Sequence, residues 1–214
     1  TEEAVSLTKH AEKAGADGAL VVTPYYNKPT QEGLYQHYKA INDNTSLPII
    51  IYNIPSRCVI DMTVDTMSKL FELKNIVGVK DATGDLNRID QTIKKLGPEF
   101  IQLTGEDGLA FEFNKRGGVG IISVTANIAP KLCSDFQKYS KSKSHNEIKE
   151  AERIDQMLQP LHKSLFIESN PAPVKYAAKL LGLCEDEIRL PLVKIKKETQ
   201  EKIKKSLLSA KLLN

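Results

Sequence analysis

The sequence predicts an α/β fold of about five β/α units with a parallel sheet, followed by a helical C-terminal region. Three observations support this fold class. Five short apolar runs are separated by longer amphipathic segments, and the runs begin at intervals of roughly 20 to 30 residues, the length of one β/α unit. The repeated strand–helix–strand order favours parallel pairing with right-handed crossovers. No further strand is expected after the fifth apolar run.

Each expected strand is short and rich in aliphatic, β-branched or aromatic residues, which is typical of strands that are buried on both faces. The five strands are expected at 18–22, 48–52, 76–79, 100–103 and 119–124.

The segments between the strands have helical periodicity. In 86–96 the apolar residues recur at helical spacing, and Gly97 followed by Pro98 ends that helix. Thr63 or Asp61 is expected to cap the helix that follows the second strand. A helix is also expected from the first residues, and since the chain opens with threonine instead of methionine, the sequence reads as the middle of a protein.

The C-terminal part of the chain is expected to be helical throughout. A Lys/Glu-rich run near its end is interpreted as a solvated helix face and not as a binding patch. The expected helices span 130–139, 146–166, 173–182 and 193–213.

Composition and charge exclude several classes of protein. The net charge of +3 is too small to indicate nucleic acid or an anionic membrane as a partner. No apolar run approaches the roughly 20 residues that span a bilayer, and the first residues do not resemble a secretory signal. The three cysteines are widely spaced, without a CxxC or Cys/His cluster, which favours a reducing cytoplasm and gives no sign of a metal site.

Lys80 is the most informative candidate for chemistry. It ends the third apolar run, and active sites of parallel α/β barrels lie at the C-terminal ends of the strands. Burial of a lysine there should lower its pKa and make the amine nucleophilic enough to form a Schiff base with a ketone. The alternative is a structural lysine that forms a salt bridge with Asp81 or Glu106.

Tyr52 and Arg57 follow the second strand. Tyr52 lies one β/α unit before Lys80, so the two side chains are expected to meet, and a phenol there can relay protons to an imine; the alternative is a packing role. Arg57 can bind a substrate carboxylate through two hydrogen bonds, and the alternative is a surface arginine.

Five motifs occur in a specific order along the chain, and NPAPVKYAAKLLGL and RLPL follow them. In this order the motifs resemble the dihydrodipicolinate synthase family, which belongs to the N-acetylneuraminate lyase superfamily of class I aldolases. The resemblance covers essentially the whole chain. It implies a TIM (β/α)8-barrel fold, represented here by the last five strands in 1–140 and a C-terminal helical region in 141–214. The motifs are TPYYNKP, YNIPSR, GVKDATG, TGED and GGVGIISVTAN.

The resemblance assigns roles to four residues near the reaction. Lys80 matches the imine-forming lysine, and Tyr52 matches the proton-relaying tyrosine. Arg57 matches the arginine that binds the carboxylate of aspartate semialdehyde. Tyr26 matches a catalytic tyrosine that reaches across a dimer interface into the partner's site.

Four further positions are implied to line the substrate or regulatory sites. Gly105 and Ile122 match positions around the bound pyruvate. Tyr25 and Glu3 match positions near an interface cavity where lysine acts as an allosteric inhibitor in many members. Cys58 departs from the family pattern, in which a small hydroxyl residue or glycine is commoner.

The resemblance implies condensation of pyruvate with aspartate semialdehyde to 4-hydroxy-tetrahydrodipicolinate, in lysine and diaminopimelate biosynthesis. The reaction would proceed through a pyruvate imine on Lys80, without a metal or organic cofactor. Arg57 favours the synthase over the sialic-acid lyases of the superfamily, which usually lack an arginine there. A cytoplasmic homotetramer, built as a dimer of dimers, is also implied.

The Gly-Thr-Thr-Gly-Glu motif of the family, which binds the pyruvate carboxylate, does not occur in this sequence. Five of eight strands cannot close a barrel, so this chain alone is expected to be inactive or nearly so. The alternatives to a working synthase are an inactive truncated remnant and a related pyruvate aldolase with another aldehyde substrate.

Overall fold

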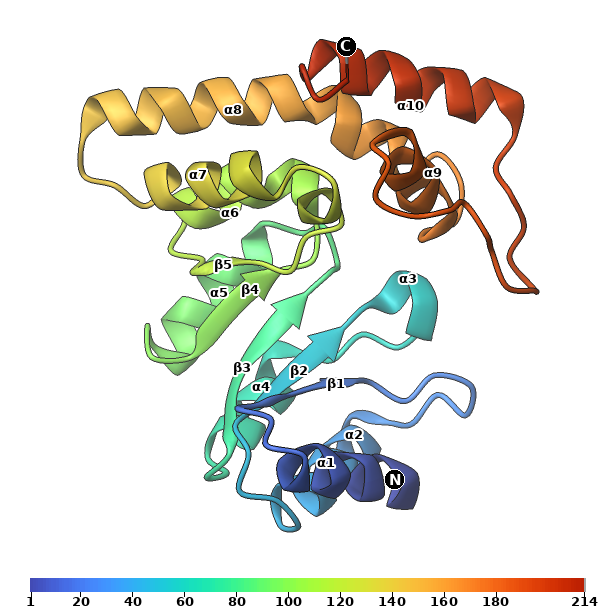
Figure 1. Ribbon diagram of the computed structural model, residues 1–214. Helices are drawn as coiled ribbons and strands as arrows, with labels where there is room; N and C mark the ends of the chain where they lie inside the picture. Colours follow the sequence, from blue (N-terminus) through green and yellow to red (C-terminus); the bar gives the residue numbers. More distant parts are fainter. Residues whose placement is uncertain (214) are drawn as a thin grey trace. The chain divides into compact units, whose positions relative to one another are not determined.

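The computed structural model describes residues 1–213, whose contacts form two compact units. The first unit is Thr1–Ile122, and the second begins at Ser123. The first contains all of the described strands, and the second is helical (Figure 1).

The strands of the first unit form one parallel sheet with the order β1-β2-β3-β4-β5, as the repeated β/α pattern predicts. The fifth strand is shorter than the predicted 119–124. The carbonyl of Thr104, the last residue of β4, accepts a hydrogen bond from the amide of Ile122, and β4 has no residue beyond it to pair with. The strands are β1 (Ala19–Val22), β2 (Ile49–Asn53), β3 (Ile76–Asp81), β4 (Ile101–Thr104) and β5 (Gly120–Ile121).

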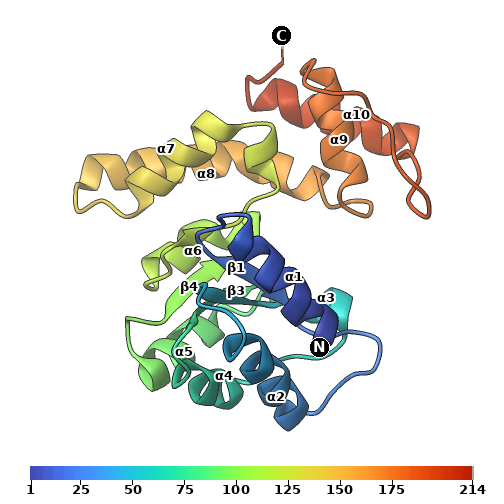
Figure 2. The same ribbon diagram turned by 60° about the horizontal axis from the view of Figure 1, so that its bottom comes forward.

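Four of the helices in this unit pack in chain order along one face of the sheet (Figures 1 and 2). Thr63, and not Asp61, caps the third of them, since its hydroxyl accepts a hydrogen bond from the Thr66 amide. Gly97 ends the fourth with a φ of +83°, as predicted. These helices are α1 (Glu2–Lys13), α2 (Gln31–Asn42), α4 (Val64–Phe71) and α5 (Asn87–Leu96).

Three short elements of the first unit were not predicted, because one or two turns are too short to show a hydrophobic period. They are α3 (Pro55–Cys58), the 3₁₀ turn η1 (Asp107–Leu109) and α6 (Ala110–Lys115).

The main core lies between the sheet and the helices. Successive strand residues point to opposite faces, so Ile49 and Ile51 of β2 are buried against α2 and α4, while Tyr52 lies on the opposite face. The expectation that every strand is buried on both faces is wrong for β1. Leu20 and Val22, which share one face of β1, are 45% and 44% exposed, so that face is not covered within the first unit.

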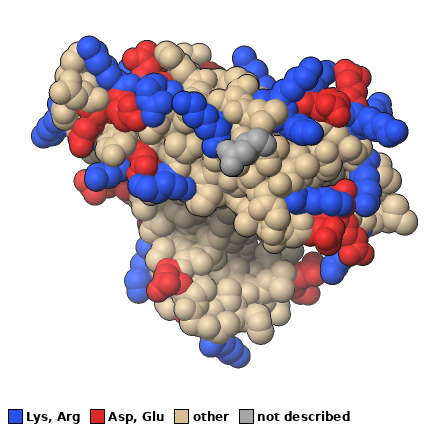
Figure 3. Space-filling view, turned by 45° about the horizontal axis from the view of Figure 1, so that its top comes forward, with Lys and Arg blue, Asp and Glu red and all other residues tan. Residues whose placement is uncertain are grey.

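The second unit contains the four predicted C-terminal helices. Helix α7 packs against α8, and α10 packs against α8 and α9. The Lys/Glu-rich run is a solvated face, as predicted, since Lys202 is exposed and pairs with Glu198. Over the face of the protein drawn in Figure 3, positive and negative side chains are interspersed. No helix within residues 1–213 is both long and apolar enough to cross a membrane. The unit comprises η2 (Thr125–Asn127), α7 (Pro130–Ser140), α8 (His145–Ser164), α9 (Ala172–Leu180) and α10 (Lys197–Ser209).

Candidate active site

Tyr52 and Lys80 form the centre of the candidate site. They are paired in the register of β2 and β3, near the C-terminal ends of both strands. The Nζ of Lys80 lies 3.9 Å from the centroid of the Tyr52 ring, a distance at which the charged amine and the aromatic face attract each other. The sequence-based expectation that these two side chains meet is therefore confirmed.

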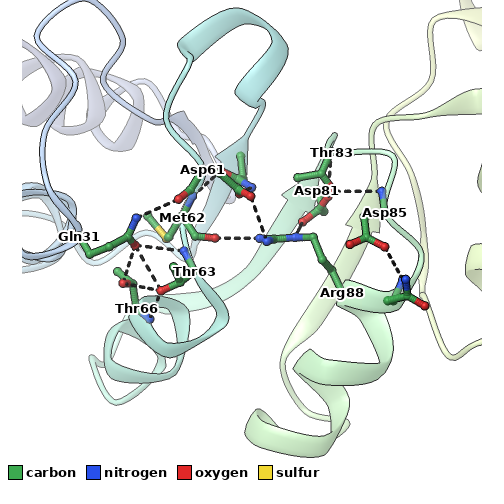
Figure 4. Close-up of polar contacts among 11 residues, drawn as sticks. Gln31, Asp61, Met62, Thr63, Thr66, Asp81, Thr83, Asp85 and Arg88 are labelled. Atoms are coloured by element: carbon green, nitrogen blue, oxygen red, sulfur yellow. Dashed lines mark hydrogen bonds and ion pairs between the residues drawn. The ribbon is translucent and has the colours of Figure 1, made fainter.

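The environment of Lys80 favours its neutral amine. Only 8% of the residue is exposed, and this burial lowers the pKa of the Lys80 amine, against the opposing charges of Asp107 and Glu106. Asp81, one of the two carboxylates considered as a salt-bridge partner, pairs instead with Arg88, with 2.9 Å between Nε and Oδ2 (Figure 4). A lysine with a lowered pKa in this position can act as a nucleophile at lower pH than an exposed one.

Two acidic residues that follow β4 lie within electrostatic range of Lys80, and neither was among the predicted site residues. Burial raises the pKa of Glu106, and the charges of Asp107 and Asp81 raise it further, whereas Lys80 lowers it. Asp107 is buried. The TGED motif at a strand end was the available signal, since it places both acids at the same sheet edge as Lys80.

Tyr52 is influenced by the loop that follows β2. Burial raises the pKa of the Tyr52 phenol, and the positive charge of Arg57 lowers it. Arg57 lies on α3 and is exposed, so it is accessible to a dissolved anion. Cys58, where the sequence departs from the family pattern, is buried in a small cluster with Ile54 and Ala82.

Gly105 packs directly against Lys80. A Cβ atom at this position would lie 3.1 Å from Cε of Lys80 and 2.8 Å from Cβ of Ala82. The Gly105 amide donates a hydrogen bond to the Asp81 carbonyl. Ile122 is exposed and follows β5, two strands along the sheet from Lys80. The structure therefore brings Gly105 to the reactive amine and places Ile122 farther along the same edge.

Glu3, Tyr25 and Tyr26 lie together at a different place in the first unit. All three line an open groove of about 810 Å³ between α1, β1 and the loop after β1. Tyr26 is 91% exposed, and the exposed side chains of Leu20 and Val22 line the same groove. The two predicted regulatory positions, Tyr25 and Glu3, thus share one surface with Tyr26.

The part of the chain that the structure describes contains no cluster of side chains suited to a metal ion. Among residues 1–213 no three His, Cys, Asp or Glu side chains come close enough together to hold a metal ion.

Comparisons with known proteins place the chain in a family. Residues 1–210 match the Dihydrodipicolinate synthetase family. The chain is 71% identical to a 4-hydroxy-tetrahydrodipicolinate synthase of Pelagibacter ubique over 213 residues, which cover all of this chain and 73% of the relative.

Solved structures agree. The dihydrodipicolinate synthase of Acinetobacter baumannii, complexed with pyruvate, matches 99% of this chain and 72% of its own, with a TM-score of 0.94 and 46% identity. A dihydrodipicolinate synthase from Cyanidioschyzon merolae with lysine bound matches 99% of this chain and 71% of its own, with a TM-score of 0.93 and 36% identity. The five-stranded parallel sheet is part of a TIM-barrel fold, and the chain is an enzyme of the dihydrodipicolinate synthetase family.

Proposed function

We propose that this protein condenses pyruvate with aspartate semialdehyde to give 4-hydroxy-tetrahydrodipicolinate, a step of diaminopimelate and lysine biosynthesis, through a Schiff base on Lys80. The observation that carries the proposal is the contact between the buried Lys80 amine, whose pKa is lowered, and the ring of Tyr52. The names of the relatives at high identity supply the product, and one structurally similar synthase is complexed with pyruvate.

Covalent chemistry begins at Nζ of Lys80. The neutral amine adds to the ketone carbon of pyruvate, and loss of water gives an imine. Removal of a methyl proton gives an enamine, whose carbon adds to the aldehyde of the second substrate. The amino group of that substrate then displaces Lys80 from the imine carbon, which closes the ring of the product and restores the free amine. Tyr52 is the group in contact with Lys80 that can move protons in these steps.

The neighbours of the reactive pair have separate roles in the proposal. Arg57 binds the carboxylate of aspartate semialdehyde, which its exposure on α3 supports. Gly105 leaves room beside Lys80 for the keto acid, since any side chain there would contact Cε of the lysine. Ile122 lines the outer part of the pyruvate site. No organic cofactor is required by these steps.

We further propose that the protein works as a homo-oligomer, a dimer of dimers, in the cytoplasm. Tyr26 would complete a partner's site, and its 91% exposure supports a role outside its own subunit. Lysine would bind as a feedback inhibitor in the groove beside Tyr25 and Glu3, where a carboxylate is available for an amine. Three free cysteines are consistent with a reducing compartment.

The test is trapping of the imine by borohydride in the presence of pyruvate, read by intact mass and peptide mapping. The proposal predicts one reduced adduct on Lys80, against the expectation from the strand count that this chain alone is inactive. The adduct should be absent from Lys80→Ala and unchanged in Lys95→Ala, which removes an exposed lysine of α5. An adduct without condensation of aspartate semialdehyde would indicate a related aldolase with another aldehyde. No adduct from the folded protein would favour the inactive alternative.

A further inference from the structure

A closed network of polar side chains lies directly behind the reactive pair. Asn53 and Asp81 immediately follow Tyr52 and Lys80, and they are themselves paired in the register of β2 and β3. Because successive strand residues point to opposite faces, Asn53 and Asp81 lie on the sheet face opposite the reactive pair. Any contact that fixes Asn53 relative to Asp81 therefore also fixes Tyr52 relative to Lys80.

Asp61 and Arg88 connect these two residues. Asn53 donates a hydrogen bond from Nδ2 to Oδ1 of Asp61 at 2.7 Å. Arg88 bonds the other oxygen of Asp61 at 3.3 Å through Nη1, and Oδ2 of Asp81 at 2.9 Å through Nε (Figure 4). The four residues Asn53, Asp61, Arg88 and Asp81, here called the Arg88 network, thus bridge β2 and β3 from the side of α5.

The geometry of this network depends on the guanidinium group. Arg88 uses a third nitrogen, Nη2, to bond the carbonyl of Met62 at 2.8 Å, so one planar group holds three partners in fixed directions. Asn53 is fully buried, and the side chains of Arg88 and Asp81 are each only 13% exposed. Charge-assisted hydrogen bonds are strong in such shielded surroundings, whereas the bond to Asp61, whose side chain is 47% exposed, is partly screened by water. A lysine could keep the charge but could not reproduce the three directions.

The same network anchors the loop that carries Arg57. The amide of Met62 donates to Oδ1 of Asn53 at 3.0 Å, and Gln31 of α2 donates to the Asp61 carbonyl at 2.8 Å. These bonds tie the end of the loop to the strand from which it starts. Three of the four residues assigned to the reaction, Lys80, Tyr52 and Arg57, are thus attached to one set of polar contacts.

We propose that Arg88, acting with Asp61, is a positioning residue that holds Lys80, Tyr52 and the Arg57 loop in their reactive arrangement. This inference rests on the proposed Schiff-base function. Arg88 lies at the sheet face opposite the reactive pair. It acts through the residues adjacent to Tyr52 and Lys80 and does not touch the substrate.

The test compares Arg88→Lys and Asp61→Asn with Arg116→Lys as a matched control. Arg116, like Arg88, pairs with an aspartate: its Nη1 lies 2.6 Å from Oδ2 of Asp90, but neither residue belongs to the network. The rate of borohydride-trapped adduct formation is measured at saturating pyruvate across pH, together with thermal unfolding.

We expect Arg88→Lys and Asp61→Asn to remain folded and to form the adduct at least about tenfold more slowly, because small displacements of reacting groups are costly. The midpoint of the pH profile should rise, since a less tightly held Lys80 gains access to water. The double variant should be no slower than the slower single variant, because both break one network. Arg116→Lys should match the parent protein in rate and midpoint.

A merely structural role would reduce the folded fraction and lower the rate equally at every pH, with an unchanged midpoint. That result, or an unchanged rate in folded Arg88→Lys, would overturn the inference while the proposed function stands. A folded parent protein that forms no adduct on Lys80 would overturn the proposed function, and this inference with it.

Discussion

Lys80 and Tyr52 are direct register partners on neighbouring parallel strands, and the lysine Nζ lies 3.9 Å from the centre of the tyrosine ring. Backbone pairing brings a nucleophile and a proton-carrying group to the same edge of the sheet. The pairing and the Arg88 network on the opposite face together hold the two residues in a rigid arrangement. This rigidity is what a covalent catalyst requires, because reacting groups must be held within a narrow range of geometry.

Tyr52→Phe separates the packing role of the ring from the chemistry of the hydroxyl. The aromatic contact with Lys80 is retained, so the variant should fold with unchanged thermal stability. Adduct formation with pyruvate should be slower by about 10²-fold or more, because general acid–base catalysis contributes factors of this size. Borohydride trapping under single-turnover conditions measures the rate. Tyr139→Phe, at the end of α7, is the matched control, and equal rates for both variants would contradict the proton-relay role.

The lowered pKa of Lys80 predicts a stability effect with a defined sign. Because the amine has a lower pKa when folded than when unfolded, the unfolded chain binds more protons between the two values, and stability rises with pH through that window. Lys80→Met removes the titrating group while keeping a long side chain. We expect Lys80→Met to unfold at a higher temperature than the parent protein at neutral pH, with the difference shrinking as the pH approaches about 10.

Thermal unfolding of both proteins at several pH values tests this expectation, and Lys95→Met is the control for loss of an exposed lysine. A difference between the parent protein and Lys80→Met that stays constant from neutral pH to about 10 would contradict the linkage, because the unfolded lysine titrates there.

Gly105→Ala tests the close approach of the backbone to Lys80. The new Cβ would lie 2.8 Å from Cβ of Ala82, and neither atom can move without its backbone. We expect a loss of about 1–3 kcal/mol in the free energy of unfolding, as for overpacked sites, and slower adduct formation because Cε of Lys80 is displaced. Chemical denaturation and trapping measure the two effects. Gly18→Ala should lower the free energy of unfolding less, because its new Cβ would lie 3.3 Å from the Pro48 carbonyl oxygen. A larger loss for Gly18→Ala than for Gly105→Ala would contradict the packing argument.

The sheet and the reactive pair could be predicted because both follow from periodic patterns. Apolar runs at β/α spacing identify the strands, and a lysine at the end of one such run faces the same edge as a tyrosine at the end of the previous one. The positions of α4 and α5 follow from helical periodicity in the same way. Each of these features involves residues that are close in sequence or separated by a single β/α unit.

The Arg88 network could not be predicted, because it joins residues 53, 61, 81 and 88 through side-chain geometry that appears only in the folded unit. Asp61 illustrates the difficulty. Its position before a helix suggested a capping role, but Thr63 caps that helix, and Asp61 instead accepts hydrogen bonds from Asn53 and Arg88. Likewise, the exposure of Leu20 depends on which elements cover β1, and this covering cannot be inferred from the apolar sequence of the strand itself.

Arg57→Lys distinguishes binding of the second substrate from formation of the imine. Lysine keeps the positive charge that lowers the pKa of Tyr52 but lacks the planar pair of donors for a carboxylate. Adduct formation with pyruvate should therefore be unchanged. The KM for aspartate semialdehyde should rise by about tenfold or more, since hydrogen bonds to charged groups contribute roughly 1.5–3 kcal/mol. Steady-state kinetics with each substrate varied in turn measure both effects. An unchanged KM for the aldehyde in the folded variant would contradict carboxylate binding by Arg57, because lysine cannot reproduce the planar pair of donors.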